Sequence, residues 1–424
     1  MRLALISHSA GGGGAERALA RLARFLDREA WQPLVVVPEP GPLADELSSQ
    51  GIAVSVLPTA WWIPATHWPA AQFVAQLAGL EERAAGLAAL LAAERIDIVH
   101  SNTVVTLEGA VAAARLGLPH TWHSRGLFDD RFPPPYFGDL AFLFAAFDRL
   151  ADSLVCVSGA VADQSRAHCR EVPVEVVPDG LDLEGLARRA AAVSRGHVLG
   201  QLDLPADARI VACVGGLQRR KGQLDLVLAA ARIAGRFPDA FFVLAGSASD
   251  PEYVTTLRDH LEELGLTARF RLAGYLDAAP LLAQCELLVH PSHSEGFGLA
   301  VLEALALGRP VVATRCGGPE ELVEPGRTGL LVPPAEPEAL ASAISVVLAA
   351  EARFDPEAAR VRASAFGPQA AGTAFEAFLR RAHARHAASR AGIARKKAAD
   401  LLLAELSARA ARLGGPAAPP PSSP

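Results

Sequence analysis

Short apolar runs alternate with amphipathic stretches along most of this chain. One such stretch, 18–26, places its apolar residues at helical spacing. Short continuous apolar runs predict buried strands, and strands that alternate with helices predict parallel α/β sheets. Strands are therefore expected at 2–6, 34–37, 54–57, 96–100, 120–123, 154–157 and 174–177, and again at 210–214, 241–245, 270–272, 287–290, 311–313 and 330–332.

This order of elements predicts two doubly wound α/β domains. The first is expected over residues 1–182 and the second over 206–368, with a linker at 183–205 between them. A long helix is expected over 369–413, and a disordered tail over 414–424, which holds five prolines.

A loop at the carboxyl end of the strand 287–290 is the first candidate site. Glu295 is followed by the turn Gly296-Phe297-Gly298 and by a helix that begins at Leu299. In open α/β sheets ligands bind at this end of the strands. Glycines let backbone N–H groups approach a ligand, and the free N–H groups of a helix start attract anions. The loop therefore predicts a phosphate site.

Two carboxylates accompany this predicted phosphate site. Glu295 lies in the loop, and Glu303 lies in an apolar run eight positions further on, roughly the same side of a helix. A carboxylate beside a phosphate is repelled, so both are expected to bind hydroxyls, at the two ends of a nucleotide-sugar. The alternative is an ordinary helical crossover with solvated carboxylates.

The same segment resembles the signature of the retaining nucleotide-sugar glycosyltransferases of the GT-B fold, the glycosyltransferases group 1 family. The match comprises Glu295 and Glu303 around Gly-Phe-Gly, then Gly-Arg-Pro-Val-Val at 308–312, Gly-Gly-Pro-Glu-Glu at 317–321 and Thr-Gly-Leu-Leu-Val at 328–332. The resemblance implies two Rossmann-like domains that face each other across a cleft. It also implies transfer, with retention of configuration, from a UDP- or GDP-sugar to a saccharide or lipid-linked acceptor, in cell-surface polysaccharide biosynthesis.

The glycine run after the first strand has two interpretations. The resemblance places Gly13, Gly14 and Glu16 in a loop that faces the cleft, near the phosphate and the acceptor. A dinucleotide-binding turn is the alternative, with Glu39 as the acid that binds the ribose. That turn needs a small third residue, where this chain has Glu16 or Arg17, so a bulky charged side chain would spoil the packing of helix on strand.

Further site residues follow from the resemblance. His123, at a strand end, would contact the donor sugar close to the reacting carbon and, with Glu295, form the catalytic pair; a strand-end histidine is otherwise bonded to backbone. The loop after strand 210–214 holds the consecutive cations Arg219-Arg220-Lys221, which suit a diphosphate or, alternatively, form a solvated basic turn. Lys221 matches the family. The family's arginine stands where this chain has Gly216, so Arg219 or Arg220 would replace it. The donor site is accordingly expected to comprise Gly13, Gly14, Glu16, Arg220, Lys221, Gly296, Phe297, Gly298, Leu299 and Glu303.

Composition excludes several classes of protein. The formal net charge is −6, which gives no sign of nucleic-acid binding. The five cysteines show no paired spacing and are expected to be reduced residues of a cytoplasmic core. Neither a metal nor a cofactor is expected, since cations of the chain would neutralise the diphosphate and no Asp-x-Asp pair occurs. The N-terminal run reads as a strand rather than a signal peptide, and no run is long enough to span a membrane.

Two segments raise the question of a membrane surface. The stretch Trp61–Pro69 holds three of the five tryptophans and predicts either an acceptor or membrane contact, or a hydrophobic lid packed on its own helix. The final helix holds nine Arg or Lys and three acidic residues between Glu376 and Arg412. It would brace the first domain, as in the resembled family, or meet anionic lipid heads at the inner face of a membrane.

Three other functions stay open at this point. A sugar-nucleotide epimerase would convert the donor without an acceptor. A nicotinamide-dependent oxidoreductase would bind its dinucleotide at the N-terminal glycine run. A non-catalytic sugar-binding protein would bind the donor without turnover.

Overall fold

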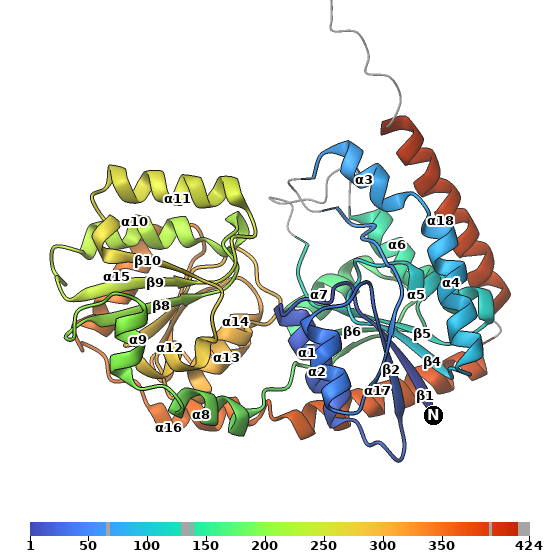
Figure 1. The fold of residues 1–424 in the computed structure, drawn as a ribbon, viewed down its shortest axis with the longest axis horizontal. Helices are drawn as coiled ribbons and strands as arrows, with labels where there is room; N and C mark the ends of the chain where they lie inside the picture. The colour runs from blue at the N-terminus through green and yellow to red at the C-terminus, as the bar shows by residue number, and fades with distance from the viewer. Residues whose placement is uncertain (65–67, 129–135, 137–139, 390–391, 414–424) are drawn as a thin grey trace, which may run out of the picture. The chain divides into compact units, whose positions relative to one another are not determined.

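The computed structural model describes all residues except 65–67, 129–135, 137–139, 390–391 and 414–424. The chain divides into two compact units (Figure 1). Unit 1 comprises Met1–Val157, Ala162–Val177 and Gly372–Pro424, and unit 2 comprises Ser158–Val161 and Pro178–Ala371.

Unit 1 is built on a seven-stranded sheet whose strands are all parallel. The strands are β1 (Arg2–Ile6), β2 (Gln32–Val37), β3 (Ala53–Val56), β4 (Ile98–Ser101), β5 (His120–Ser124), β6 (Ser153–Cys156) and β7 (Val174–Val176). They lie in the order β3-β2-β1-β4-β5-β6-β7, so the order reverses between β1 and β4. Its helices are α1 (Gly14–Phe25), α2 (Pro42–Ser49), α3 (Ala70–Leu77), α4 (Leu80–Ala93), α5 (Glu108–Leu116), α6 (Ala141–Leu150), α18 (Gly392–Leu413) and, except for their first turns, α7 (Gly159–His168) and α17 (Pro368–Ala388).

Helix α17 supplies part of the core of unit 1, although it lies near the other end of the sequence. Phe375, Phe378, Leu379 and Ala382 are fully buried and pack with residues of β1, β2, α1 and α2. Their spacing puts all four on one helix face. Ion pairs add to this contact, since Arg381 and Arg385 both bind Glu175 of β7.

The chain end holds two helices where the sequence predicts one. The backbone N–H of Ser389 donates to the carbonyl groups of both Arg385 and His386, which tightens the last turn of α17. Helix α18 begins at Gly392. Serine and glycine are weak helix formers, which accounts for a break here. Helix α18 packs against α3, α5 and α6. Its Ala399, Leu402 and Leu406 are buried.

Unit 2 is built on a six-stranded parallel sheet. The strands are β8 (Arg209–Val214), β9 (Ala240–Ala245), β10 (Phe270–Gly274), β11 (Leu287–His290), β12 (Val311–Thr314) and β13 (Gly329–Val332), in the order β10-β9-β8-β11-β12-β13. Its α-helices are α8 (Leu183–Ala191), α9 (Arg195–Gln201), α10 (Gln223–Ile233), α11 (Pro251–Glu263), α12 (Ala278–Gln284), α13 (Leu299–Ala306), α14 (Gly318–Leu322), α15 (Pro337–Leu348) and α16 (Pro356–Ser364), and short 3₁₀ turns lie at Arg219–Lys221 and Thr267–Arg269.

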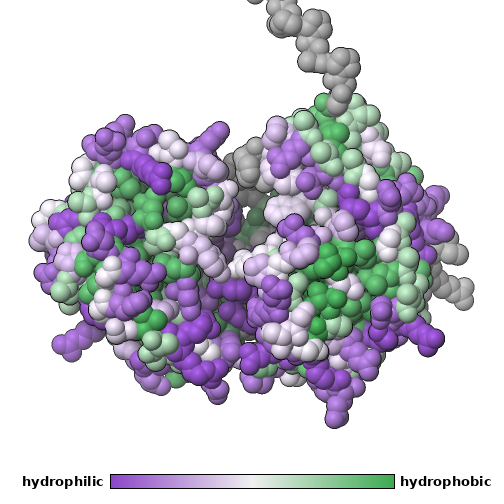
Figure 2. Space-filling model, in the orientation of Figure 1, coloured by the Kyte–Doolittle hydropathy of each residue, from purple (hydrophilic) through white to green (hydrophobic). Residues whose placement is uncertain are grey.

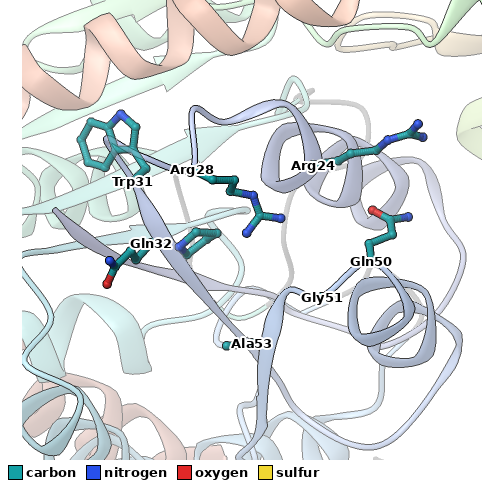
Figure 3. Close-up of a pocket in the computed structure, with 8 residues that line it drawn as sticks. Arg24, Arg28, Trp31, Gln32, Gln50, Gly51 and Ala53 are labelled. Atoms are coloured by element: carbon teal, nitrogen blue, oxygen red, sulfur yellow. The ribbon is translucent and has the colours of Figure 1, made fainter.

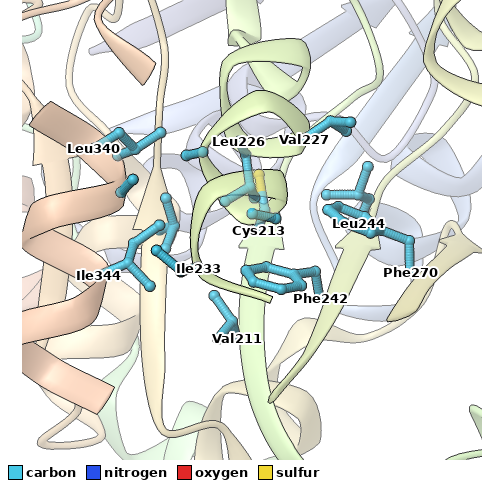
Figure 4. Packing of buried hydrophobic residues seen from close by; sticks show 14 of the residues in the cluster. Val211, Cys213, Leu226, Val227, Ile233, Phe242, Leu244, Phe270, Leu340 and Ile344 are labelled. Atoms are coloured by element: carbon cyan, nitrogen blue, oxygen red, sulfur yellow. The ribbon is translucent and has the colours of Figure 1, made fainter. Parts of the chain in front are cut away.

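The core of unit 2 lies between its sheet and the helices α10, α11 and α15. Figure 4 shows Val211, Cys213, Phe242 and Leu244 of neighbouring strands meeting Leu226 and Ile233 of α10 and Leu340 and Ile344 of α15. Phe242 is fully buried and stacks on Phe270 with ring centroids 4.9 Å apart. Burial of one such side chain stabilises a fold by roughly 1.5–3 kcal/mol.

Residues 183–205, expected to form a linker, contain the helices α8 and α9 of unit 2. Each helix has a side-chain cap at its start. Asp182 accepts a hydrogen bond from the Gly185 N–H, and Ser194 accepts one from the His197 N–H. Capping by aspartate and serine is typical of helix starts and explains why this polar stretch is helical.

The visible surface is mainly hydrophilic, with smaller apolar areas between the charged groups (Figure 2). The large hydrophobic residues that are exposed in the described part of the chain are scattered over both units: Met1, Val56, Leu116, Val176, Leu264, Tyr275, Val361, Leu401 and Leu413. Singly exposed apolar residues are normal for a protein surface. Within the described residues, no helix is long and apolar enough to cross a membrane.

Candidate active site

The loop between β11 and α13 is fixed by its neighbour along the sheet. The N–H of Glu295 donates to the Cys316 carbonyl, and the N–H of Gly318 donates to the Glu295 carbonyl. A Cβ at Gly318 would lie 2.3 Å from the Cα of Phe297, so a glycine is required there. These contacts hold the turn at 296–298 at the carboxyl end of β11, where the sequence predicts it.

Helix α13 begins at this turn. Gly298 has a φ of 98°, in the left-handed region, and forms the N-cap of the helix. Glycine adopts this conformation without steric cost. The free N–H groups of the first turn, from Leu299 on, therefore lie beside Glu295 and the glycine turn, and this helix start can hold an anion.

Three cationic or titratable side chains surround the Glu295 carboxylate. Lys221 forms a short ion pair with it, His290 Nε2 lies 3.3 Å from Glu295 Oε2, and Arg220 Nη1 lies 4.0 Å from the same oxygen. Burial alone would raise the pKa of Glu295, but Lys221, a hydrogen bond from His290 and Arg220 outweigh it and hold that pKa well below its usual range. The carboxylate is therefore ionised at neutral pH.

The neighbouring arginines take different directions. Arg220 Nη1 donates to the Ser294 carbonyl at 2.5 Å, so its guanidinium lies beside the Glu295 loop. Arg219 instead lies over the Tyr253 ring, with Nε 3.8 Å from Asp250. Arg219 and Arg220 are the two candidates to replace the family's arginine, which this chain lacks at Gly216. Of these two, Arg220 lies beside Glu295.

Glu303 is buried in α13, with 3% of its surface exposed. Glu295, in contrast, precedes the helix and is tied to the loop at 316–318. Helical periodicity therefore does not relate the two carboxylates, although a spacing of eight suggests one face. Their separation depends on the path of the Gly296–Gly298 turn.

In unit 1 the predicted glycine loop lies between β1 and α1. Helix α1 begins at Gly14, and the carboxylate of buried Glu16 folds back over Gly13, where a Cβ would lie 2.6 Å from Glu16 Oε2. His8, which sequence reasoning missed, places Nε2 3.6 Å from Glu16 Oε1. Glu16 and Arg17 are thus the large charged residues at the third position of the run, where the dinucleotide turn needs a small residue.

His123 is the last residue but one of β5 and is 1% exposed. Its Nδ1 lies 3.1 Å from Nη2 of Arg125, and the ring of His100 stands edge-on to it with centroids 5.7 Å apart. Burial, followed by the charges of Arg125 and His100, holds the pKa of His123 well below its usual range. The imidazole is therefore neutral at physiological pH.

The tryptophan stretch is largely part of unit 1. Trp62 is buried and its Nε1 donates to the carbonyl of Val104, in the loop between β4 and α5, at 2.8 Å. Trp61 is partly exposed; its ring stacks on Trp68 with centroids 5.7 Å apart and is tilted to the His8 ring with centroids 5.5 Å apart. Residues 65–67 of the stretch lie outside the described residues.

A cavity of about 610 Å³ lies elsewhere in unit 1 (Figure 3). Gln32 and Ala53, which line it, are the first residues of β2 and β3, so it lies at the amino ends of the strands. None of the predicted site residues lines it; the lining residues are Arg24, Arg28, Trp31, Gln32, Pro33, Gln50, Gly51 and Ala53.

Family models match each half of the chain. The model of Glycosyltransferase Family 4 matches residues 12–184, and that of Glycosyl transferases group 1 matches residues 208–350. The first match falls mainly in unit 1 and the second lies within unit 2. Together the two units form the two-domain Rossmann-like GT-B fold, as the sequence predicts.

Curated relatives match in part of their length. The chain is 34% identical over 207 residues to the D-inositol 3-phosphate glycosyltransferase of Corynebacterium urealyticum, which covers 47% of this chain and 49% of that protein. It is 32% identical over 205 residues to the lipopolysaccharide core biosynthesis glycosyltransferase LpsE of Rhizobium meliloti, covering 48% of this chain and 56% of that one. The chain thus spans about half the length of these relatives.

Solved GT-B structures match over nearly the whole chain. HepE of Anabaena, in complex with UDP-glucose, superposes with a TM-score of 0.71 at 26% identity, covering 90% of this chain and 100% of HepE. Sucrose-phosphate synthase of Thermosynechococcus elongatus superposes with a TM-score of 0.72 at 25% identity, covering 91% and 99%.

Proposed function

We propose that this chain transfers a sugar from a nucleotide-diphosphate sugar, a UDP- or GDP-sugar, to a saccharide or lipid-linked acceptor, with retention of configuration at the transferred carbon. The observation that carries the proposal is the ion cluster of Lys221, Arg220 and Glu295 at the start of α13. The names of the relatives support it, since they describe glycosyltransferases, and HepE binds UDP-glucose.

The leaving group of such a reaction is a nucleoside diphosphate. Lys221, Arg220 and the N–H groups at the start of α13 are fixed in place before the reaction, so they stabilise the developing negative charge without further reorganisation. Both cations lie beside the Glu295 carboxylate, which compensates part of their charge. The diphosphate would share these cations with the carboxylate.

Glu295 would orient the sugar. An ionised carboxylate only accepts hydrogen bonds, so its partners on the donor are hydroxyl groups. Its lowered pKa makes it a weak base and a weak nucleophile, which favours a role in orientation over attack on the sugar. Glu303 would accept hydroxyl groups at the other end of the donor, and Gly13, Gly14 and Glu16 of unit 1 would lie near the phosphate and the acceptor. His123 would contact the donor sugar.

Calorimetric titration with UDP, UDP-glucose, GDP and GDP-mannose tests the donor site, and product analysis with saccharide and lipid-linked acceptors tests transfer. We expect one nucleotide series to bind and its sugar to be transferred, with the anomeric configuration retained by NMR. Transfer should survive excess EDTA, because cations of the chain neutralise the diphosphate. Absence of binding by every nucleotide, or a loss of transfer that Mg²⁺ restores, would contradict the scheme.

The place of this reaction in the cell follows from its acceptor. The named relatives glycosylate inositol phosphate or build a lipopolysaccharide core, and a role in cell-surface polysaccharide biosynthesis at the cytoplasmic side of a membrane fits those acceptors. Flotation with anionic vesicles measures whether the chain binds such a membrane.

A further inference from the structure

Polar groups at the carboxyl edge of the sheet in unit 1 form one continuous hydrogen-bonded chain. Arg125, just after β5, donates from Nε to the backbone oxygen of Asn102 at 2.8 Å and from Nη2 to Asn102 Oδ1 at 2.7 Å. The same Nη2 lies 3.1 Å from Nδ1 of His123. Asn102 Nδ2 in turn donates to the Ala15 carbonyl at 3.0 Å, in the first turn of α1.

Because arginine can only donate hydrogen bonds, it determines which of these atoms donate and which accept. A guanidinium has five N–H donors, no acceptor, and keeps its proton in proteins. His123 Nδ1 must therefore accept, which places the single proton of a neutral imidazole on Nε2. Asn102 Oδ1 must likewise accept, which leaves Nδ2 to donate to Ala15, as observed.

Among the described residues, the other ring nitrogen of His123 has no contact of this kind. His123 Nε2 is buried and has no hydrogen-bond partner among the described residues. The adjacent His100 does not supply one through Nδ1, which pairs with Thr121 Oγ1 at 2.8 Å. A buried donor that is left unpaired destabilises a fold, so such a group calls for an explanation in function.

We infer that Arg125 is a positioning residue that holds His123 as the neutral tautomer protonated on Nε2, so that the ring donates a hydrogen bond to an oxygen atom of the nucleotide-sugar. His123 then does not act as the base that deprotonates the acceptor, because its only free nitrogen already carries a proton. Asn102 connects this ring to the glycine loop that holds Gly13 and Glu16. The inference rests on the proposed function for the identity of the ligand.

The tautomer can be measured without any ligand. Long-range ¹H–¹⁵N spectra of the ¹⁵N-histidine-labelled chain report the protonation of each ring nitrogen, and His123→Gln identifies the His123 signals among the 12 histidines. We expect a protonated Nε2 and a bare Nδ1 in the wild type, and an averaged mixture of tautomers in Arg125→Met. A proton on Nδ1 in the wild type, or an unchanged His123 signal in Arg125→Met, would overturn the inference.

Kinetics test the consequence for the reaction, as the release of UDP from UDP-glucose. Arg125→Met should lower kcat by about tenfold to a hundredfold with little change in KM, the size of effect expected for a displaced hydrogen-bond donor. Arg166→Met is the matched control, since Arg166 is 51% exposed and pairs with Asp163 on the surface of α7. A kcat for Arg125→Met equal to that of Arg166→Met would overturn the inference.

Two substitutions of His123 distinguish a side chain that donates a hydrogen bond from one that accepts a proton as a base. The amide of His123→Gln can still donate a hydrogen bond, whereas the carboxylate of His123→Glu can only accept one. We expect His123→Gln to retain more activity than His123→Glu, and the reverse order would show that His123 accepts a proton. Thermal unfolding of each variant identifies any loss of folding. If the wild type does not turn over UDP-glucose, that failure concerns the proposed donor, and the NMR measurement still decides the tautomer.

Discussion

Lys221 is the side chain whose removal tests the candidate donor site most sharply. Its ammonium pairs with the Glu295 carboxylate at the start of α13, and both side chains are about 85% buried, with 15% and 14% exposed. Lys221→Met keeps the length of the side chain and removes the charge. Because Arg220 and His290 also lie beside Glu295, the carboxylate keeps partial compensation and the fold should survive.

The expected loss of affinity follows from the bond that is removed. A hydrogen bond to a charged group contributes about 1.5–3 kcal/mol, so the Kd for UDP should rise by about tenfold to a hundredfold. Titration calorimetry of UDP into wild type and Lys221→Met measures this ratio. Thermal unfolding of both chains shows whether the change affects folding as well.

Lys397→Met is the matched control, because Lys397 is an exposed lysine on α18 in the other unit. It should leave the Kd for UDP unchanged. A Kd for Lys221→Met within twofold of the wild-type value, in a folded chain, would remove Lys221 from the donor site. An equal loss of UDP affinity in both variants would show that the net charge of the protein, rather than a contact of Lys221, causes the loss.

Three further predictions concern pH, packing and backbone. The lowered pKa of Glu295 stabilises the fold fully at pH values above the ordinary carboxyl pKa of 4.5, and this contribution is lost as the pH falls through the lowered pKa. The difference in unfolding temperature between wild type and Glu295→Gln should therefore shrink below about pH 4.5. A difference that grows there would contradict the lowered pKa of Glu295. Phe378→Ala should destabilise unit 1 by about 3–5 kcal/mol in urea unfolding, because Phe378 is fully buried. The control Leu401→Ala removes an exposed side chain and should cost less than about 0.5 kcal/mol. Equal effects would show that α17 is not part of the core of unit 1. Gly298→Ala places a side chain on a residue with a φ of 98° and should lower the free energy of unfolding by about 1–2 kcal/mol. In the control Gly196→Ala, in helix α9, the added Cβ meets nothing within 4 Å, so this change should be neutral or stabilising by up to about 1 kcal/mol. Similar unfolding temperatures for the two variants would refute the argument from φ.

The sheets could be predicted from the sequence because their central strands, such as β4 and β11, are buried along their whole length. Such strands read as continuous apolar runs, and every expected strand is present with ends that differ by a few residues at most. The helical stretch 183–205 escaped prediction because its short helices depend on caps at Asp182 and Ser194 rather than on a long apolar stripe. The break near Ser389 escaped it for a related reason, since the helical pattern continues on both sides.

The candidate site could be predicted in kind but not in detail. The glycine turn at 296–298 and the cation Lys221 are visible as a motif, and the assignment of the site residues remains a prediction. The choice between Arg219 and Arg220 depends on which guanidinium reaches Ser294, and the contact between Arg125 and Asn102 depends on how the ends of β4 and β5 lie side by side. Such pairings follow from tertiary packing, which a motif does not encode.

Helix α17 has a consequence for how the chain is made. Because Gly372–Pro424 belongs to unit 1, a ribosome finishes all of unit 2 before it releases the segment that completes the first-begun domain. Domains generally fold as units in the order in which they are synthesised, and here that order is inverted. A chain that stops at Ala371 should therefore keep unit 2 resistant to limited proteolysis while the N-terminal residues are digested, because the domain begun first lacks Phe375, Phe378 and Leu379 of its core.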